Sequence, residues 1–112
     1  MNVTNCNAKR AIRRNQGAGY HYFSPDTMAC FGSIVHKAYE GADGTYYVVM
    51  SNRWGIDDDE SAFRYHVVVT VDRDGMTSVD GGRLVMDREV PIRSTAWTYH
   101  QADNYARARA AQ

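Results

Sequence analysis

The spacing of apolar residues changes along the chain, and each change marks a different predicted element. Near the start, Ala8, Ala11 and Ile12 recur with Asn15 at helical spacing, while Lys and Arg residues cover the opposite side. This pattern predicts an amphipathic helix over residues 7–16. The glycines that follow should end it, because glycine readily adopts the left-handed conformation found after helices.

A second, short helix is predicted from the residues that open it. Ser24 can accept a hydrogen bond from a free backbone N–H, and Pro25 suits the first helical position. Asp26 adds a negative charge near the positive end of the helix dipole. Met28 and Phe31 lie three residues apart, so both are expected to face the core.

From residue 33 the period of the pattern falls to two, which is typical of strands. The expected strands are residues 33–40, 45–52, 62–72 and 76–79, with an edge piece at 83–86. Glycine-containing turns at 41–44, 74–75 and 80–82 would join them, and residues 53–61 would form a longer loop. The alternation is clearest over residues 62–72, so we expect a strand with one buried face there.

The last segment predicts another helix, capped by Ser94 or Thr95 and continuing to about residue 110. The predicted apolar stripe of this helix consists mostly of small residues, namely Tyr99, Ala102, Ala106 and Ala110. Residues 87–93 contain Pro91, which is tolerated only at a sheet edge or in a loop. Together the elements predict one α+β domain over residues 1–112. It would be a four- to five-stranded antiparallel meander between an N-terminal helix plus short second helix and a C-terminal helix.

Composition supports a globular domain and narrows its partners. The 112 residues are 44% hydrophobic and 23% charged, and no apolar run is long enough to span a membrane. We therefore expect a protein of the host-cell cytoplasm with no membrane partner and with reduced thiols at Cys6 and Cys30. The net charge is zero, but residues 1–40 carry five basic and two acidic side chains, residues 41–92 five and ten, and residues 93–112 three and one. A neutral domain with an acidic middle weakens the case for general nucleic-acid binding.

Residues with chemical potential are scattered rather than grouped. The four histidines, His21, His36, His66 and His100, form no local ligand pair, and the cysteines have no metal-ligand spacing. The glycines follow neither phosphate-loop pattern, and no nucleophile is marked by a neighbouring base. The sequence therefore predicts no catalytic residue, no metal site and no cofactor.

Three groups of residues are candidates for contact with a partner. They are the basic face of the first helix (Arg10, Arg13, Arg14), the aromatic segment after it (Tyr20, His21, Tyr22), and Trp54 with the acidic run that follows (Asp57, Asp58, Asp59). An exposed tryptophan beside charges is typical of interface hot spots. Ordinary explanations compete with each group: a solvated helix face, aromatics that close one end of the core, and a solvated loop. A ligand cleft between the short helix and the sheet, with the aromatic segment at its mouth, also stays open.

Residues 19–28, which read Gly-Tyr-His-Tyr-Phe-Ser-Pro-Asp-Thr-Met, resemble a motif of small uncharacterised proteins from phages and mobile elements of actinobacteria. Those proteins begin with a basic helix, continue into a tyrosine-rich antiparallel sheet and close with an Ala/Arg-rich helix. The resemblance is specific over residues 8–31 and general thereafter. The chain departs from the motif at Ala29 and Cys30, where the group has Arg and an aromatic residue. The resemblance implies a phage origin and a shared fold, but no reaction.

The sequence therefore leaves three functions open. The first is a non-enzymatic, phage-borne protein-interaction module that binds an unidentified host or phage protein and modulates or inhibits it. The second is a nucleic-acid-binding accessory domain that uses the basic terminal helices. The third is a small enzyme with a site built from distant His and Asp residues. An exposed edge strand would also allow a homodimer to form by strand addition.

Overall fold

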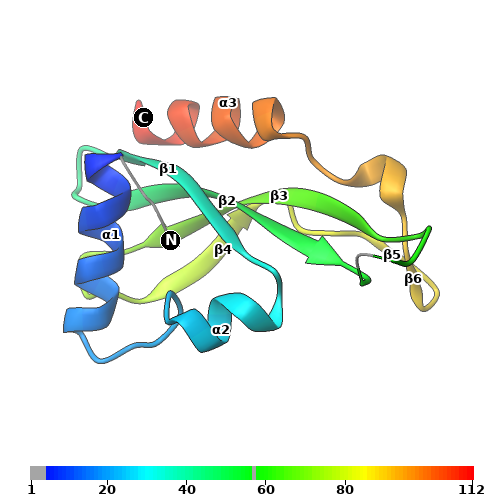
Figure 1. Cartoon of the computed structure of the whole chain (residues 1–112). Helices are drawn as coiled ribbons and strands as arrows, with labels where there is room; N and C mark the ends of the chain where they lie inside the picture. Colours follow the sequence, from blue (N-terminus) through cyan, green and yellow to red (C-terminus); the bar gives the residue numbers. More distant parts are fainter. Residues whose placement is uncertain (1–4, 57) are drawn as a thin grey trace.

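A computed structural model describes residues 5–56 and 58–112 and shows a four-stranded antiparallel sheet with helices on both faces (Figure 1). The strands follow the order β1-β2-β3-β4, which is a simple meander. In chain order the elements are α1 (Cys6–Gly17), α2 (Pro25–Cys30), β1 (Ile34–Glu40), β2 (Tyr46–Trp54), β3 (Phe63–Val71), β4 (Thr77–Gly81), β5 (Met86–Asp87), β6 (Val90–Pro91), the 3-10 turn η1 (Arg93–Thr95) and α3 (Tyr99–Ala110). The predicted α+β arrangement is confirmed.

One face of the sheet packs against α1 and α2. Ala8 and Ala11 of α1 are completely buried, as the helical spacing predicts, and Met28 of α2 is buried beside them. On the sheet side this core consists of Val35, Ala38, Tyr46, Val48, Met50, Val67, Val69 and Val71. The Asn5 side chain begins α1 and the Ser24 side chain begins α2, each by accepting a backbone N–H of the first turn.

The opposite face is covered by α3, which lies across β2 and β3. Ala102 and Ala106 are fully buried against Tyr47, Val49 and Val68. These alanines allow α3 to lie close to the sheet, as the predicted stripe of small residues implies. The prediction of a single buried face for residues 62–72 is wrong, because Val68 is covered as fully by α3 as its neighbours are by the core on the other side.

Three local predictions are also wrong. Phe31 does not face the core: it follows the last residue of α2, where the backbone leaves the helix, and its side chain is 60% exposed. Neither Ser94 nor Thr95 caps the last helix, because both belong to η1, and Thr98 caps α3 instead. Residues 83–86 add no fifth strand to the sheet, since β5 pairs only with β6 in a separate small hairpin.

A β-bulge in β1 changes the side chains that this strand presents. Val35 pairs with Met50 and Lys37 pairs with Val49, so one extra residue, His36, stands between consecutive partners on β2. The His36 ring contacts Ser51, and the Lys37 ammonium contacts Asp103 of α3. Two consecutive polar residues of β1 therefore lie on the side of the sheet that α3 covers.

Two further findings concern the chain as a whole. Within residues 5–56 and 58–112, no helix is long and apolar enough to cross a membrane. Cys6 and Cys30 are both exposed and unpaired.

Candidate functional site

Two of the four histidines, His36 and His66, lie side by side on the α3 side of the sheet. The rings of His36 and His66 lie 5.5 Å apart, and the ring of Tyr99 lies 5.5 Å from the first and 6.0 Å from the second. His100 follows Tyr99, with its ring 5.8 Å from the Tyr99 ring. His21 is separate, since it precedes α2 on the other side of the molecule and is exposed.

Hydrogen bonds fix this cluster in place. His36 Nε2 lies 3.0 Å from Ser51 Oγ, and Arg64 Nη1 donates to the same hydroxyl over 2.9 Å. His66 Nδ1 lies 3.1 Å from the carbonyl oxygen of Trp97, which can only accept, so Nδ1 carries the proton. Burial, the neighbouring His66 and Arg64 lower the pKa of His36 below its ordinary value of 6.5.

The Ser51 hydroxyl and His36 are close enough for a nucleophile and its base, but their surroundings favour a structural role. Ser51 has no exposed surface, so a substrate has no path to its oxygen. Its hydroxyl also accepts a hydrogen bond from the Arg64 guanidinium, which lowers its value as a nucleophile. Hydrogen bonds to the Ser51 hydroxyl therefore link His36 of β1 and Arg64 of β3 to β2, next to a groove that Arg64 lines.

That groove lies between β3 and the segment from η1 to the first turn of α3, and it encloses about 300 Å³. We call it the basic groove. Its lining residues are Phe63, Arg64, His66, Arg93, Ala96, Trp97, Thr98 and Tyr99. Two arginines and a histidine contribute to it, and no described lining residue is acidic. The groove is held in place by the backbone, because the N–H of His66 donates to the carbonyl of Trp97 over 3.1 Å.

Two further hollows lie at the same end of the sheet, and only the first of them shares lining residues with the basic groove. One, of about 250 Å³, is lined by Arg53, Asp59, Ala62, Phe63 and Arg64. The other, of about 230 Å³, lies between α2 and the sheet and is lined by Tyr22, Thr27, Met28, Phe31, Ser33, Asn52 and Tyr65. Between these hollows the ring of Phe63 is stacked with Trp54 at 5.8 Å and lies 6.4 Å from Tyr65. We call Phe31, Trp54, Phe63, Arg64, Tyr65 and Arg93 the aromatic end.

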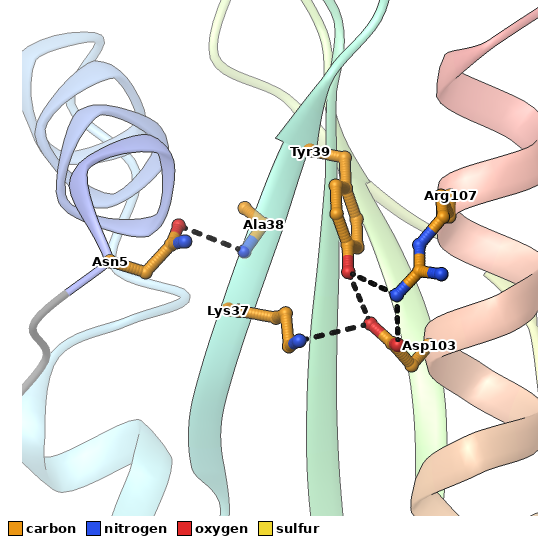
Figure 2. A network of polar contacts seen from close by, with 6 residues as sticks. All are labelled: Asn5, Lys37, Ala38, Tyr39, Asp103 and Arg107. Atoms are coloured by element: carbon orange, nitrogen blue, oxygen red, sulfur yellow. Dashed lines mark hydrogen bonds and ion pairs between the residues drawn. The ribbon is translucent and has the colours of Figure 1, made fainter.

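A second polar network joins β1 to α3 (Figure 2). The Tyr39 hydroxyl donates to Asp103 Oδ1 over 2.5 Å, Lys37 Nζ lies 3.4 Å from the same oxygen, and Arg107 Nη2 donates to Oδ2 over 2.9 Å. Burial alone would raise the pKa of the Asp103 carboxyl, but Tyr39, Lys37 and Arg107 outweigh it and hold the pKa below its ordinary value of 3.8. This network attaches α3 to the sheet.

The basic face of α1 lies far from the aromatic end. The β2–β3 ladder runs from the pair Tyr46–Val71 to the pair Trp54–Phe63, which is roughly 26 Å at about 3.3 Å per residue. Arg14 lies at the first of these ends: its Nη1 donates to the carbonyls of Gly44 (2.6 Å) and Asp72 (3.3 Å). Its guanidinium also stacks on Tyr46, so Arg14 ties α1 to two turns, whereas Arg10 and Arg13 are exposed.

The other predicted partner residues are divided between the two ends. Tyr20 and His21 are exposed and do not line the hollow beside α2, whereas Tyr22 does. Trp54 is half-buried as the last residue of β2 rather than part of a loop. Asp58 and Asp59 are exposed, and Asp59 lines a hollow that also contains Arg64. Asp57 lies outside the described residues.

Several residues of this region escape sequence reasoning. Arg64 and Arg93 are isolated arginines in the sequence, 29 positions apart, and Trp97 lies in the predicted last helix but outside its predicted apolar stripe. The only signal is the density of aromatic residues near Phe63 and again near Trp97, and it becomes informative only when the fold brings both segments together.

Among the described residues, no group of three or more His, Cys, Asp or Glu side chains could hold a metal ion.

Comparisons with known proteins add no family to this description. No family model, no curated protein and no solved structure matches the chain.

Proposed function

We propose that the protein is a non-enzymatic, phage-borne interaction module that binds one host or phage protein through its aromatic end and thereby modulates or inhibits that protein. The observation that carries this proposal is that three hollows, on both faces of the sheet, lie at the same end of β3. Phe63 and Arg64 line two of them, and Tyr65 lines the third. Concave surfaces rich in Trp, Tyr and Arg are typical of the anchors that dominate protein interfaces.

Exposed aromatic and cationic side chains at the aromatic end also favour an interface. Phe31 is 60% exposed at the mouth of the hollow beside α2, and the Arg93 guanidinium lies 5.4 Å from the centre of the Phe63 ring. A partner could insert side chains into the hollows on either side of the Trp54–Phe63 stack and cover the rings between them. Burial of these aromatic surfaces would supply the main favourable free energy.

The nucleic-acid alternative has less support, because several cations of the terminal helices are already engaged. Arg107 is paired with Asp103 and Arg109 with Asp80, and Arg14 is bonded to backbone carbonyls. Arg10 and Arg13 remain exposed on α1, which lies on the other face of the sheet from α3 and its arginines. Two such separated faces do not form the continuous basic stripe that a phosphate backbone requires.

The proposal is tested by affinity capture from a nuclease-treated actinobacterial lysate with matched surface variants. Phe31→Ser and Trp54→Ala alter the aromatic end, and Met76→Ser replaces a similarly exposed apolar side chain (53% exposed) near the opposite end of β3. We expect one stoichiometric protein with the wild type and with Met76→Ser, and at least about tenfold less with either variant of the aromatic end.

Two results would contradict the proposal. Equal capture by all four proteins would remove the aromatic end as the binding surface. Capture that is present without nuclease and absent after it would favour the nucleic-acid alternative instead. Circular dichroism of each variant checks that a loss of capture does not reflect a loss of folding.

A further inference from the structure

We infer that the basic groove binds an anionic side chain, a carboxylate or a phosphate ester, carried next to an aromatic ring on a segment of the partner protein. This inference rests on the proposed function and names the chemistry that the partner presents to the aromatic end. It derives from the charges, the walls and the surroundings of the groove.

The two arginines of the groove have positive charges that no described carboxylate neutralises. Arg64 Nη1 donates to two neutral oxygens, Gly32 O at 2.8 Å and Ser51 Oγ at 2.9 Å, which orients the guanidinium but leaves its charge. The Arg93 side chain forms no hydrogen bond or ion pair with a described residue and lies over the Phe63 ring. Other cations of the molecule, Lys37, Arg107 and Arg109, do have carboxylate partners.

Orientation makes these charges suitable for an oxyanion. A guanidinium presents its N–H donors in a planar fork that matches two oxygens of a carboxylate or phosphate. Arg64 is fixed through one nitrogen, so less side-chain entropy is lost when its remaining donors bind a ligand. The His66 ring also lines the groove, and the hydrogen bond from its Nδ1 to the Trp97 carbonyl fixes its orientation.

The walls of the groove favour an anion attached to a ring. Phe63, Trp97 and Tyr99 line it together with the cations, and its volume of about 300 Å³ exceeds what one inorganic anion occupies. A ring carried by the ligand can stack on these side chains while its charged group reaches the arginines. The expected ligand is therefore a short acidic and aromatic segment rather than a free ion.

The surroundings of the groove disfavour a long polyanion. Asp59 lines the adjoining hollow, and Asp58 and Glu60 are exposed in the same loop. A nucleic-acid strand that extended from the groove past Arg64 would bring its phosphates toward these carboxylates. A side chain with one anionic group avoids this repulsion, because its charge ends at the two arginines.

The test uses small probes and NMR on the isolated, ¹⁵N-labelled full chain. The probes are phenyl phosphate and phenylacetate as ring-bearing anions, inorganic phosphate as an anion without a ring, benzyl alcohol as a ring without charge, and adenosine monophosphate and oligothymidylate as nucleic-acid probes. We expect saturable shifts of the Trp97 indole N–H and of backbone amides at Arg64, His66 and Arg93 with either ring-bearing anion. Inorganic phosphate and benzyl alcohol should each bind at least about tenfold more weakly.

Variants separate the groove from general electrostatic attraction. Arg93→Gln should weaken binding of the ring-bearing anion about tenfold, and Arg93→Lys should weaken it less because the charge remains. Arg13→Gln removes an equally exposed arginine from α1 and should leave binding unchanged. Arg64→Gln is a second variant, and its amide spectrum shows whether the sheet stays folded after two hydrogen bonds are lost.

Three outcomes would overturn the inference: no saturable shift with either ring-bearing anion, equal weakening by Arg93→Gln and Arg13→Gln, or tighter binding of a nucleic-acid probe than of phenyl phosphate. The proposed function is judged separately. Lysate capture that depends on Phe31 and Trp54 but not on Arg93 would support the interface at the aromatic end and contradict an anionic group in the basic groove. Anion binding without any captured protein would keep the groove and contradict the interaction module.

Discussion

Among single residues, His36 is the one whose protonation bears most directly on the sheet. The ring lies in the bulge of β1, beside His66, Arg64 and the Ser51 hydroxyl, and Lys37 follows it on the same face. Burial of the ring disfavours its charged form, and the neighbouring His66 and Arg64 disfavour it further. The neutral ring is therefore the form that the fold favours.

His36 should make the protein less stable in mild acid. Its pKa is lowered in the folded state, so the unfolded chain takes up the proton first as the pH falls through 6.5. The free energy of unfolding should thus rise with pH across the window from the folded pKa up to about 6.5. Urea titrations at a series of pH values measure it, and His36→Gln should flatten the curve. The exposed His100→Gln serves as the control; an unchanged slope in His36→Gln would exclude this group.

Asp103 acts in a lower range of pH. The lowered pKa of its carboxyl stabilises the fold above its ordinary value of 3.8, and this stabilisation is lost as the pH falls through the folded pKa. Asp103→Asn keeps the shape but removes the charge between Lys37 and Arg107. We expect a loss of about 2 kcal/mol near neutral pH and a smaller loss in acid, measured by urea unfolding. Asn104→Ala on the exposed side of α3 should not lower stability, because alanine favours helices. A similar loss there would mean that the effect does not depend on the charge of Asp103.

Among the elements, α3 depends on a cap that lies beyond the expected one. The Thr98 side chain accepts the backbone N–H of Gln101, and the Gln101 side chain accepts the backbone N–H of Thr98. Thr98→Ala should therefore cost about 1 kcal/mol of unfolding free energy, measured by thermal or urea unfolding. Ser94→Ala, at the position expected from sequence, should cost almost nothing because its side chain forms no cap. A larger effect at Ser94 would contradict this assignment of the helix start.

The elements also show which features a sequence pattern can predict. Periodicity identified α1 and the four strands of the main sheet, because a buried stripe must repeat with the geometry of its element. Periodicity did not predict that α3 buries Val68, because burial by a helix distant in the sequence does not change the local alternation of residues. Periodicity could not predict the basic groove either. Arg64 and Arg93 line the same groove only because η1 turns the chain back along β3. The predicted partner residues were drawn from local features and lie at both ends of the sheet.

For the whole molecule, the helices on both faces leave the sheet open only along its outer strands. At β1 the edge is partly closed, because Asn5 Oδ1 accepts the N–H of Ala38 over 3.2 Å (Figure 2). The same oxygen accepts the N–H of Ala8 over 2.9 Å. A free edge N–H is a template for pairing with another copy of the chain. Asn5 thus joins the stability of α1 to the protection of the sheet edge.

Loss of Asn5 should therefore affect both stability and association. Asn5→Ala removes the oxygen that accepts both hydrogen bonds, so we expect about 1–2 kcal/mol less stability and faster growth of light scattering on incubation. Asn5→Asp keeps an acceptor oxygen at this position and should behave like the wild type. Gel filtration with light scattering reports whether the products are dimers or larger assemblies. Unchanged association in Asn5→Ala would mean that the edge is protected by other means.

The position of Asn5 in the chain gives this contact a consequence for synthesis. Asn5 and α1 leave the ribosome before β1 does, so the acceptor is already present when the edge strand is paired with β2. A circular permutant that moved α1 behind α3 would reverse this order. In this permutant the sheet would be synthesised first, and the Ala38 N–H would stay uncovered until Asn5 and α1 had been synthesised.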